Sequence, residues 1–455
     1  ESFSVLKDAS ASAVYGVRGA NGVILVQTKR GKLGKPTVNV HFEQSFTQPT
    51  KLPQYIGSAE YLTLLNEIAK DNGQQQSPYS QETIDHYINR TDPDLYPDVN
   101  WMDLITKDFA MNQRADITVN GGSDILRYAV VGSYYGEQGI FERDKSQSWN
   151  SGTHLNKFNL RSNVDINITK TTQLTVSVGG YLQEMNKMAI SSDDAFSGAF
   201  ETPPFIHPAY YKEDDNIYFP VVNQRVNPYV QVTQKGYATT SQSKIELEQD
   251  LKFITPGLKI KGIFSFDRYS WSGVTRSKTP DLYQPATQRD ENGNLILNIS
   301  SYGQQFLSTS ENNDWGNKAT YVELNLNYER TFGKHQVEGL FLYNQRDYQQ
   351  FEESYDIVPY RRMGIAGRAS YTYDNRYIAE FNFGYNGSEN FAKGYRFGFF
   401  PSVAIGYLLS EEKFMEPYKD TFSKIKFRGS FGLTGNDQLD GRRFAYQTTL
   451  GEDGT

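Results

Sequence analysis

Cysteine is absent from the 455 residues of the chain, which excludes disulfides, zinc–thiolate sites and thiol nucleophiles. The sequence also lacks any run of roughly 18 apolar residues, so helical membrane spans are excluded. Basic residues are in the minority, with 46 Lys and Arg against 53 Asp and Glu, and this argues against a nucleic-acid-binding face. A membrane β-barrel is not excluded, because its alternating strands score as polar on average.

Residues for catalysis or metal binding are also scarce. The five histidines are scattered, none forms an H-x-x-x-H pair, and no G-x-S-x-G elbow occurs. We therefore expect neither an enzyme nor a resident metal or cofactor. Aromatic residues are abundant, with 32 Tyr and 28 Phe, which argues against a disordered chain.

Period-two alternation of apolar and polar residues is the dominant pattern. Within 321–328, for example, Leu324 falls on one face of a strand and Asn325 on the other. About thirteen segments share this pattern, and many exceed the roughly 5–6 residues of an ordinary strand. The segments are 37–46, 113–121, 125–136, 160–168, 171–186, 244–253, 257–273, 321–328, 334–350, 362–374, 377–385, 396–409 and 424–435.

The connections between these segments alternate in length. Short turns lie at 121–124, 169–171, 255–257, 333–334 and 374–375, and the longer connections are 47–111, 137–153, 187–237, 274–314 and 351–361. Antiparallel strands reverse direction at each step, so the short turns share one end of the sheet and the long loops the other. Outer-membrane barrels have this layout. We therefore expect an all-β fold, a transmembrane antiparallel β-barrel.

The longest loops contain signals for ordered structure. Ser58 is placed to cap a helix over 59–70, and Ser80 a second helix over 81–89. The segment 190–236 is rich in proline and aromatic residues, which predicts an ordered surface loop.

The first thirty residues have a different character. They predict a small α+β piece, with a turn at 16–22, a buried strand at 23–27 and a linker at 31–36. This piece is too short, and too rich in alanine and glycine, to fold alone.

Several stretches carry a family resemblance. Phe158 to Asp165, Tyr321 to Lys334, Tyr377 to Pro401 and Phe431 to Asp437 resemble barrel strands, and Val5 to Gly31 resembles the end of a plug domain. Together, and in this order, they resemble the SusC/RagA-like TonB-dependent outer-membrane transporters of Bacteroidota. The residues that match the plug motif are Leu6, Lys7, Asp8, Ala9, Tyr15, Gly16, Arg18, Gly19, Asn21 and Gly22.

The resemblance implies a 22-stranded barrel with a plugged lumen. Residues 1–35 would be the C-terminal part of the plug with its linker, and 36–455 the N-terminal part of the barrel. The chain would then be a fragment that lacks the TonB-contacting segment, the first part of the plug and the last barrel strands. The long loops 47–111, 187–237 and 274–314 would be extracellular.

The resemblance also implies partners and a function. The expected partners are a SusD-like lipoprotein on the outer face, TonB with ExbB and ExbD, and outer-membrane lipid. The expected function is active import of an oligosaccharide or, in some members, of a peptide across the bacterial outer membrane. Nucleic acid is not an expected partner.

Two sets of residues are candidates for functional contacts. Arg18, Lys29 and Arg30 would pair with luminal acids such as Glu246, Glu248 or Glu323, or else be solvated or pair within the plug. The tryptophans Trp149, Trp271 and Trp315 would belong to the interfacial aromatic girdle or stack on sugar rings of a substrate. Phe397, Phe399 and Phe400 are expected to be girdle or packing residues.

Two weaker motifs favour structural explanations. Gly16, Gly19 and Gly22 lack the G-x-G-x-x-G spacing of a phosphate loop, so a turn is favoured. The segment Asp290 to Asn294 resembles a calcium loop but lacks its closing glutamate, and a hairpin turn at Asn292 and Gly293 explains it better.

Two other classes of function compete with active import. A passive porin would lack the plug motif at 5–31. A secreted β-rich adhesin or carbohydrate-binding protein would not need a polar luminal face on every strand.

Overall fold

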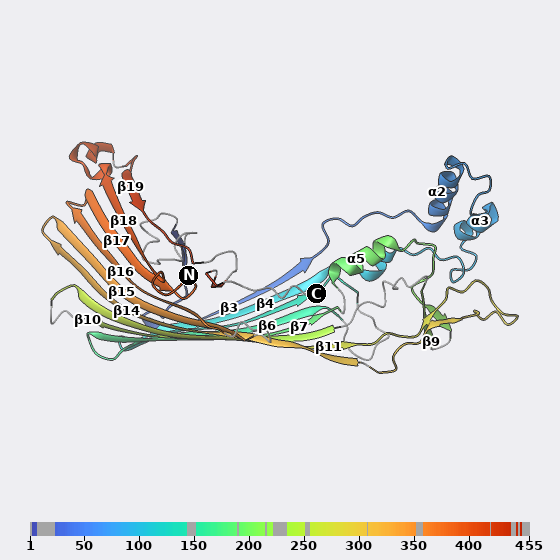
Figure 1. Cartoon of the computed structure of the whole chain (residues 1–455), viewed down its shortest axis with the longest axis horizontal. Helices are drawn as coiled ribbons and strands as arrows, with labels where there is room; N and C mark the ends of the chain where they lie inside the picture. The colour runs from blue at the N-terminus through green and yellow to red at the C-terminus, as the bar shows by residue number, and fades with distance from the viewer. Residues whose placement is uncertain are drawn as a thin grey trace.

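The fold is dominated by one curved antiparallel sheet of 13 strands (Figure 1). The computed structural model describes residues 2–6, 23–142, 152–188, 191–213, 216–221, 234–250, 255–306, 308–351, 358–418, 420–437, 443–444 and 446–447. All strands of this sheet lie in chain order, from β3 at one edge to β19 at the other. The sheet is an open trough, because its edge strands do not pair with each other.

The strands match the thirteen predicted segments, and most extend beyond them. They are β3 (Gly34–Thr47), β4 (Ala110–Gly122), β5 (Leu126–Gln138), β6 (His154–Asn167), β7 (Thr172–Lys187), β10 (Gln234–Asp250), β11 (Leu258–Ser277), β14 (Ser308–Phe332), β15 (His335–Phe351), β16 (Tyr360–Tyr373), β17 (Tyr377–Ser388), β18 (Phe397–Leu408) and β19 (Lys426–Gly432).

The two faces of the sheet differ as the alternation predicts. On the convex, outward face, Leu324 is 48% exposed and Ile405 is 70% exposed. On the concave face, the polar side chains of Asn163, Asn325 and Asn382 are buried among neighbours. Such a sheet presents apolar side chains to lipid and polar ones to a lumen.

Aromatic residues also gather on the outward face at the short-turn end. The rings of His335 and Tyr373 lie 5.1 Å apart, those of Tyr373 and Tyr377 6.5 Å, and those of Tyr377 and Tyr407 5.3 Å. A row of this kind is typical of an interfacial girdle.

The three phenylalanines at the other end of β18 divide between the faces. Phe397 and Phe399 are exposed on the outward face. Phe400 packs from the concave side, because a Cβ atom on Gly435 would lie 2.4 Å from its ring.

Turn chemistry places the short connections at one end of the sheet. Asp374 and Asn375 both have positive φ, 52° and 56°, which is the type I′ pattern. They are the central residues of a turn closed by the Arg376 amide, which donates to the Tyr373 carbonyl at 3.0 Å. Gly333, with φ of 60°, turns β14 into β15.

The short turns lie close to their expected positions. The connections expected at 187–237 and 274–314 are shortened by the strands, since β10 begins at Gln234, β11 ends at Ser277 and β14 begins at Ser308.

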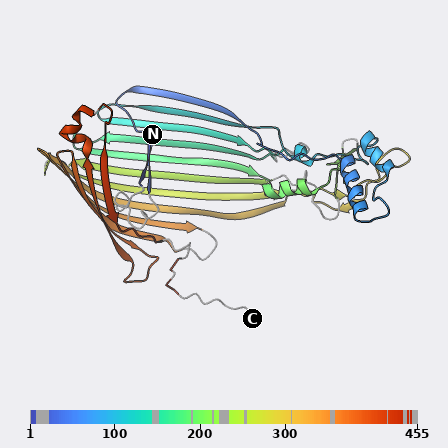
Figure 2. The ribbon, with the colours of Figure 1, turned by 90° about the horizontal axis from the view of Figure 1, so that it is seen from above.

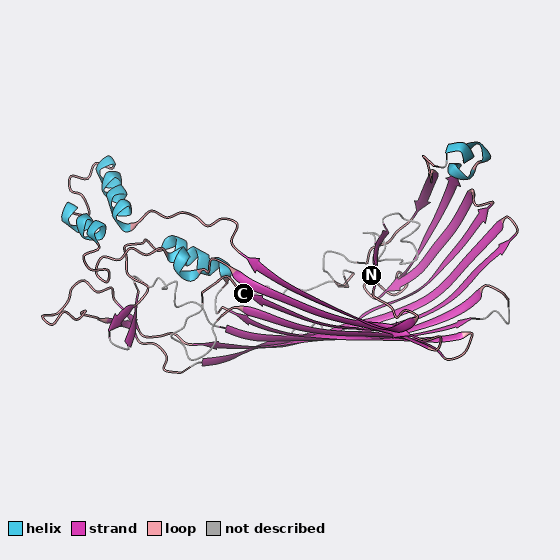
Figure 3. Ribbon diagram, turned by 180° about the vertical axis from the view of Figure 1, so that it is seen from behind, coloured by secondary structure: helices cyan, strands magenta, loops and turns pink. Residues whose placement is uncertain are grey.

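The long loops hold the helices and a second, smaller sheet (Figure 3). The helices are α2 (Ser58–Asp71), α3 (Gln81–Asn89), α4 (Trp101–Ile105) and α5 (Ser192–Glu201). The small sheet contains β8 (Tyr211–Glu213), β9 (Asn216–Pro220), β12 (Leu282–Tyr283) and β13 (Ile299–Ser301). Near the short-turn end lie two 3-10 helices, η2 (Leu409–Glu411) and η3 (Lys413–Tyr418). Among the described residues, no helix is long and apolar enough to cross a membrane.

One of the two predicted helix caps is correct. Ser80 caps α3, since its Oγ accepts a hydrogen bond from the Thr83 amide at 3.1 Å. Ser58 is not a cap but the first residue of α2, after Gly57. The Ser58 amide donates instead to the Asp98 carboxylate at 2.7 Å, so a residue distant in sequence takes over the capping role.

The N-terminal segment lies over the concave face of the sheet (Figure 2). Its strands β1 (Ser2–Leu6) and β2 (Val23–Gln27) pair with each other in antiparallel fashion. The strand at 23–27 was expected to be buried, but Ile24 is 68% exposed and Val26 is 73% exposed. The difference arises because β1 covers only one edge of β2 and neither of its faces.

Candidate functional site

The N-terminal segment is attached to the sheet through a buried asparagine of β6. Asn163 is 3% exposed, and its Nδ2 donates to the Lys29 carbonyl at 2.7 Å and to the Thr28 hydroxyl at 3.2 Å. Asn163 lies on the polar face of its strand, so the alternation aims its side chain at the segment that follows β2.

An ion pair lies beside this asparagine. Arg30 Nη1 is 2.8 Å from Asp165 Oδ1, and the Thr175 hydroxyl donates to the same oxygen at 2.7 Å. Asp165 is two residues beyond Asn163, on the same face of β6. The pair therefore joins the segment to the wall with a hydrogen-bonded charge.

The basic residues were expected to pair with luminal acids such as Glu246, Glu248 or Glu323, and the structure describes the outcome for Arg30. Arg30 does pair with an acid of the concave face, but with Asp165. Glu323 is engaged within its own strand, where it accepts from Asn325 Nδ2 at 2.8 Å. The side chains of Glu246 and Glu248, and the whole of Arg18, lie outside the described part of the chain.

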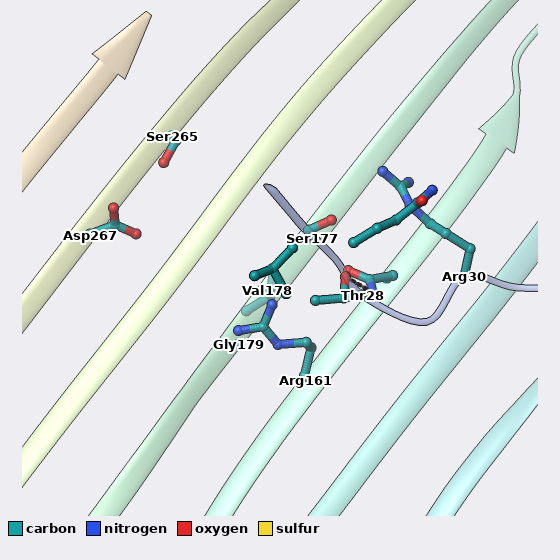
Figure 4. A pocket seen from close by; sticks show the side chains of 11 residues that line it. Thr28, Arg30, Arg161, Ser177, Val178, Gly179, Ser265 and Asp267 are labelled. Carbon is teal, nitrogen blue, oxygen red and sulfur yellow. Dashed lines mark hydrogen bonds between the residues drawn. The ribbon is translucent and has the colours of Figure 1, made fainter. Parts of the chain in front are cut away.

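A cavity of about 460 Å³ opens between the N-terminal segment and the sheet (Figure 4). Thr28 and Arg30 line one side, and polar residues of three barrel strands line the other: Arg161, Asn163, Ser177, Ser265 and Asp267. The contact between the segment and the wall is thus polar, and part of it is open.

Gly31 makes the chain's close approach to the wall possible. A Cβ atom at this position would lie 2.2 Å from the backbone nitrogen of Tyr128 and 2.6 Å from the carbonyl carbon of Arg127. Only glycine fits there, and the chain then enters β3 at Gly34. The predicted linker is therefore a tightly fitted passage along β5, and the first strand begins within it.

The three longest loops fold together into one unit, here called the loop module: the described residues of 48–109, 191–221 and 278–306. Trp101, 2% exposed, lies in its core with Met102 and Ile105 of α4 and Ala195 and Ala199 of α5. Backbone contacts support the packing, since the Val99 amide donates to the Pro204 carbonyl at 3.1 Å.

An arginine clamp connects the first and third loops of the module. Arg289 Nε donates to Asp92 Oδ2 at 2.7 Å, and its Nη2 donates to Asp94 Oδ2 at 2.6 Å. The hydrogen bonds from Arg289 hold the pKa of the Asp92 carboxyl below its usual range.

A buried tyrosine connects the second and third loops. The Ala286 amide donates to the Tyr211 hydroxyl at 2.9 Å, and burial raises the pKa of Tyr211 to about 12. The Leu295 amide donates to the Glu213 carboxylate at 2.8 Å. Tyr211 thus stays neutral at ordinary pH and serves as a fixed acceptor.

The tryptophans singled out in the sequence lie in different surroundings. Trp271 and Trp315 are paired across β11 and β14, and they share the concave face with Ser265 and Asp267. They are therefore not part of an outward girdle. Trp149 lies outside the described residues.

Of the motif residues near the N-terminus, only Leu6 is described, as the last residue of β1. Lys7, Asp8, Ala9, Tyr15, Gly16, Arg18, Gly19, Asn21 and Gly22 lie outside the described ranges. The glycine turn at 16–22 is among them.

The calcium-like segment is a turn. Both carboxylate oxygens of Asp290 are occupied, since they accept from the amides of Asn292 and Asn294 and from the Asn294 side chain. Gly293 has the positive φ, 87°, that the turn needs. Within the described ranges, no group of three or more His, Cys, Asp or Glu residues could hold a metal ion.

Four residues central to these contacts were not predicted: Asn163, Asp165, Trp101 and Arg289. A signal existed for the first two, because both fall on the polar face of the alternating segment 160–168. Trp101 and Arg289 carry no local signal, since their partners lie in other loops.

The chain resembles known proteins over nearly its whole length, although no family model matches it. It is 26% identical to TonB-dependent receptor P3 of Formosa agariphila over 96% of this chain and 42% of that protein. It is 24% identical to TonB-dependent receptor SusC of Bacteroides thetaiotaomicron over 98% of this chain and 44% of that protein. The chain is a homologue of TonB-dependent receptors.

The solved structures agree on the fold. The RagAB peptide importer in its open-open state superimposes with a TM-score of 0.72 at 16% identity, over 99% of this chain and 52% of that one. The expected outer-membrane β-barrel fold is thereby confirmed. The chain spans less than half the length of the TonB-dependent receptors named above.

Proposed function

We propose that this chain forms part of the barrel wall and part of the plug of a TonB-dependent importer of oligosaccharides in the bacterial outer membrane. Residues 1–35 would be the last part of the plug, and 36–455 the first part of the barrel. The observation that carries the proposal is the attachment of the N-terminal segment to the polar concave face through Asn163 and the Arg30–Asp165 pair.

Such a contact suits a plug that must close the barrel and later be displaced. Polar contacts beside an open cavity can be exchanged for contacts with water, whereas a close-packed apolar interface would have to expose its surface to water. Force from TonB, driven by ExbB and ExbD, would then displace the segment at a moderate cost in free energy. The motif residues Leu6 to Gly22 would belong to the displaced part.

The loop module would be the docking place of a SusD-like lipoprotein. It brings the three longest loops into one ordered surface at the long-loop end (Figure 1). Binding residues are disproportionately found on loops that a rigid scaffold positions, and the 13-stranded sheet is such a scaffold.

The alternative within the family is uptake of oligopeptides, because RagAB, whose fold this chain shares, is a peptide importer. That likeness concerns the fold alone. A passive porin fits poorly, because the N-terminal segment lies over the concave face. A secreted adhesin fits poorly too, because the outward face is apolar in mid-strand.

The test is energised uptake by cells that carry the full-length transporter and its lipoprotein. Uptake of a fluorescent hexasaccharide pool should stop when an uncoupler collapses the proton gradient. Deleting residues 1–35 together with the preceding plug should leave an open pore that leaks and no longer concentrates the sugar. Accumulation that survives both the uncoupler and the deletion would overturn the proposal.

A further inference from the structure

Six aromatic side chains form a row across the concave face of the sheet, near the long-loop end. The row contains Tyr181, Tyr269, Trp271, Trp315, Tyr348 and Tyr360. Register groups them in three pairs: Tyr181 and Tyr269 both pair with Thr240, Trp271 pairs with Trp315, and Tyr348 pairs with Tyr360. Tyr348 also pairs with Ala319, four residues from Trp315 on the same face of β14, so the row is staggered. The row spans six adjacent strands, β7 to β16, of which all but β10 contribute a ring, and it covers about 24 Å across the sheet at roughly 4.8 Å per strand step.

The rings face the lumen and not the lipid. On β11, Tyr269 and Trp271 follow Ser265 and Asp267 at intervals of two, so all four share the concave face. The outward residues of the same strand are of opposite parity, as Phe264 shows with 46% exposure. A membrane girdle therefore does not explain the row.

The rings contact each other and nearby cations while remaining partly exposed. The rings of Tyr269 and Trp315 lie 4.9 Å apart, and those of Tyr348 and Tyr360 lie 5.9 Å apart. Lys157 Nζ lies 4.1 Å from the centre of the Tyr181 ring. Trp315 is 38% exposed, so the row offers ring surface to the lumen.

A glycine fits Trp271 closely. A Cβ atom on Gly273, two residues along the same strand, would lie 2.5 Å from Cη2 of the indole. The indole therefore lies along its own strand, over the space that the missing Cβ leaves. A ring in this orientation turns one of its faces to the lumen.

Amide side chains accompany the rings. Asn317 pairs with Tyr269 on one side and with Gln350 on the other, and its parity places it on the concave face with Trp315. Both amides are partly exposed. Each carries donors and acceptors suited to hydroxyl groups.

We propose that this aromatic row binds an oligosaccharide, with pyranose faces stacked on Trp271 and Trp315 and hydroxyls bonded to Asn317 and Gln350. This rests on the proposed import function and names the place on the wall where the substrate is held. A peptide is disfavoured, because each of these six strands pairs on both sides and offers no free edge for strand addition.

The row also lies next to the N-terminal segment. Asp267 and Ser265, just below Tyr269 on β11, line the cavity that Arg30 and Thr28 share. An oligosaccharide on the row would thus lie between the loop module and the N-terminal segment, which is the part proposed to be displaced during import.

The test uses the purified full-length transporter with its lipoprotein, probed on an array of linear hexasaccharides and a library of unmodified octapeptides. Trp271→Ala combined with Trp315→Ala should weaken hexasaccharide binding at least about tenfold. Trp315→Phe should retain most of it, because a ring remains. Gly273→Ala should weaken it without removing a ring, because the new methyl displaces the Trp271 indole.

The matched control is Phe264→Ala, which removes an aromatic side chain from the outward face of β11 and should leave binding unchanged. Heat modifiability of each variant checks that the barrel is folded. Binding that survives in the double variant, binding confined to octapeptides, or no hexasaccharide binding by the parent would each overturn the proposal.

Uptake separates this proposal from the function on which it rests. Hexasaccharide binding without uptake that depends on the proton gradient would support the row and overturn import. Gradient-dependent uptake of octapeptides without hexasaccharide binding would support active import of peptides, the alternative function, and overturn the row.

Discussion

Arg30 and Asp165 are 135 positions apart in the chain, and their side chains meet at 2.8 Å. Asp165 is nearly enclosed, with a side chain 13% exposed, whereas that of Arg30 is 35% exposed. The ion pair is thus a charged contact between the N-terminal segment and the barrel wall.

Replacing Arg30 should loosen the N-terminal segment. In the full-length transporter, Arg30→Ala leaves the Asp165 carboxylate with the Thr175 hydroxyl alone, and we expect a several-fold rise in basal conductance across a planar bilayer. The double variant Arg30→Ala/Asp165→Ala should leak no more than Arg30→Ala, because no charge is stranded. Lys334→Ala, which breaks the exposed pair with Asp374 at a turn, is the control. Equal leakage from the control would contradict this role.

Arginine on the outward face should destabilise the barrel. Leu324→Arg places a charge in lipid near mid-strand, at an expected cost of about 2–4 kcal/mol, measured by urea titration of the full-length protein in lipid vesicles. Ser265→Arg, on the concave face beside the cavity, should be close to neutral. Asn325→Arg is unsuitable as a control, because Asn325 is only 7% exposed. If Ser265→Arg destabilised the barrel more than Leu324→Arg, the outward and concave faces would have been assigned the wrong way round.

The loop module should loosen in acid. Arg289 lowers the pKa of Asp92 in the folded state, whereas the unfolded value is about 3.9. The stabilising contribution is therefore complete above that value and is lost as the pH falls through the lower, native pKa. Hydrogen exchange in 81–105, corrected for intrinsic rates, should be faster at pH 3 than at pH 6.

A substitution separates the clamp from general acid effects. Arg289→Gln should give fast exchange in 81–105 already at pH 6, whereas Arg361→Gln, which breaks an exposed pair with Asp347 on the outward face, should not. Exchange that is insensitive to both pH and Arg289 would rule out the clamp.

The core of the loop module should depend on one indole. Trp101→Ala should destabilise the module by about 3–5 kcal/mol, as for other buried tryptophans. Trypsin applied to intact cells should then cut within 48–109, while the barrel keeps its heat modifiability. Tyr395→Ala, at a position 81% exposed, should change neither. If Trp101→Ala also unfolds the barrel, the module and the sheet are one cooperative unit.

The strands could be predicted because their signal is local. Alternation assigns each side chain to a face without knowledge of the neighbouring strand, and turn residues such as Asp374 and Asn375 mark the reversals. Parity alone could have assigned Trp271 to the lumen, since it lies four residues from Asp267.

The contacts between distant segments could not be predicted in this way. Alternation places several acidic residues on the concave face as possible partners of Arg30. Only the path of the chain past Gly31 brings Arg30 to Asp165. Ser58 was expected to cap α2 because the pattern is local, but the Asp98 carboxylate does so from 40 positions away. The merging of the loops likewise depends on pairs such as Arg289 and Asp92.

The shared core of the loops constrains how this surface can change. Trp101, Tyr211 and Arg289 each find their partners in a different loop from their own, so no loop carries its structure alone. Grafting a single loop from a relative would strand those partners, whereas exchange of all three as a cassette would keep them. Diversification of the outer surface should therefore proceed by coordinated replacement, with the barrel beneath left unaltered.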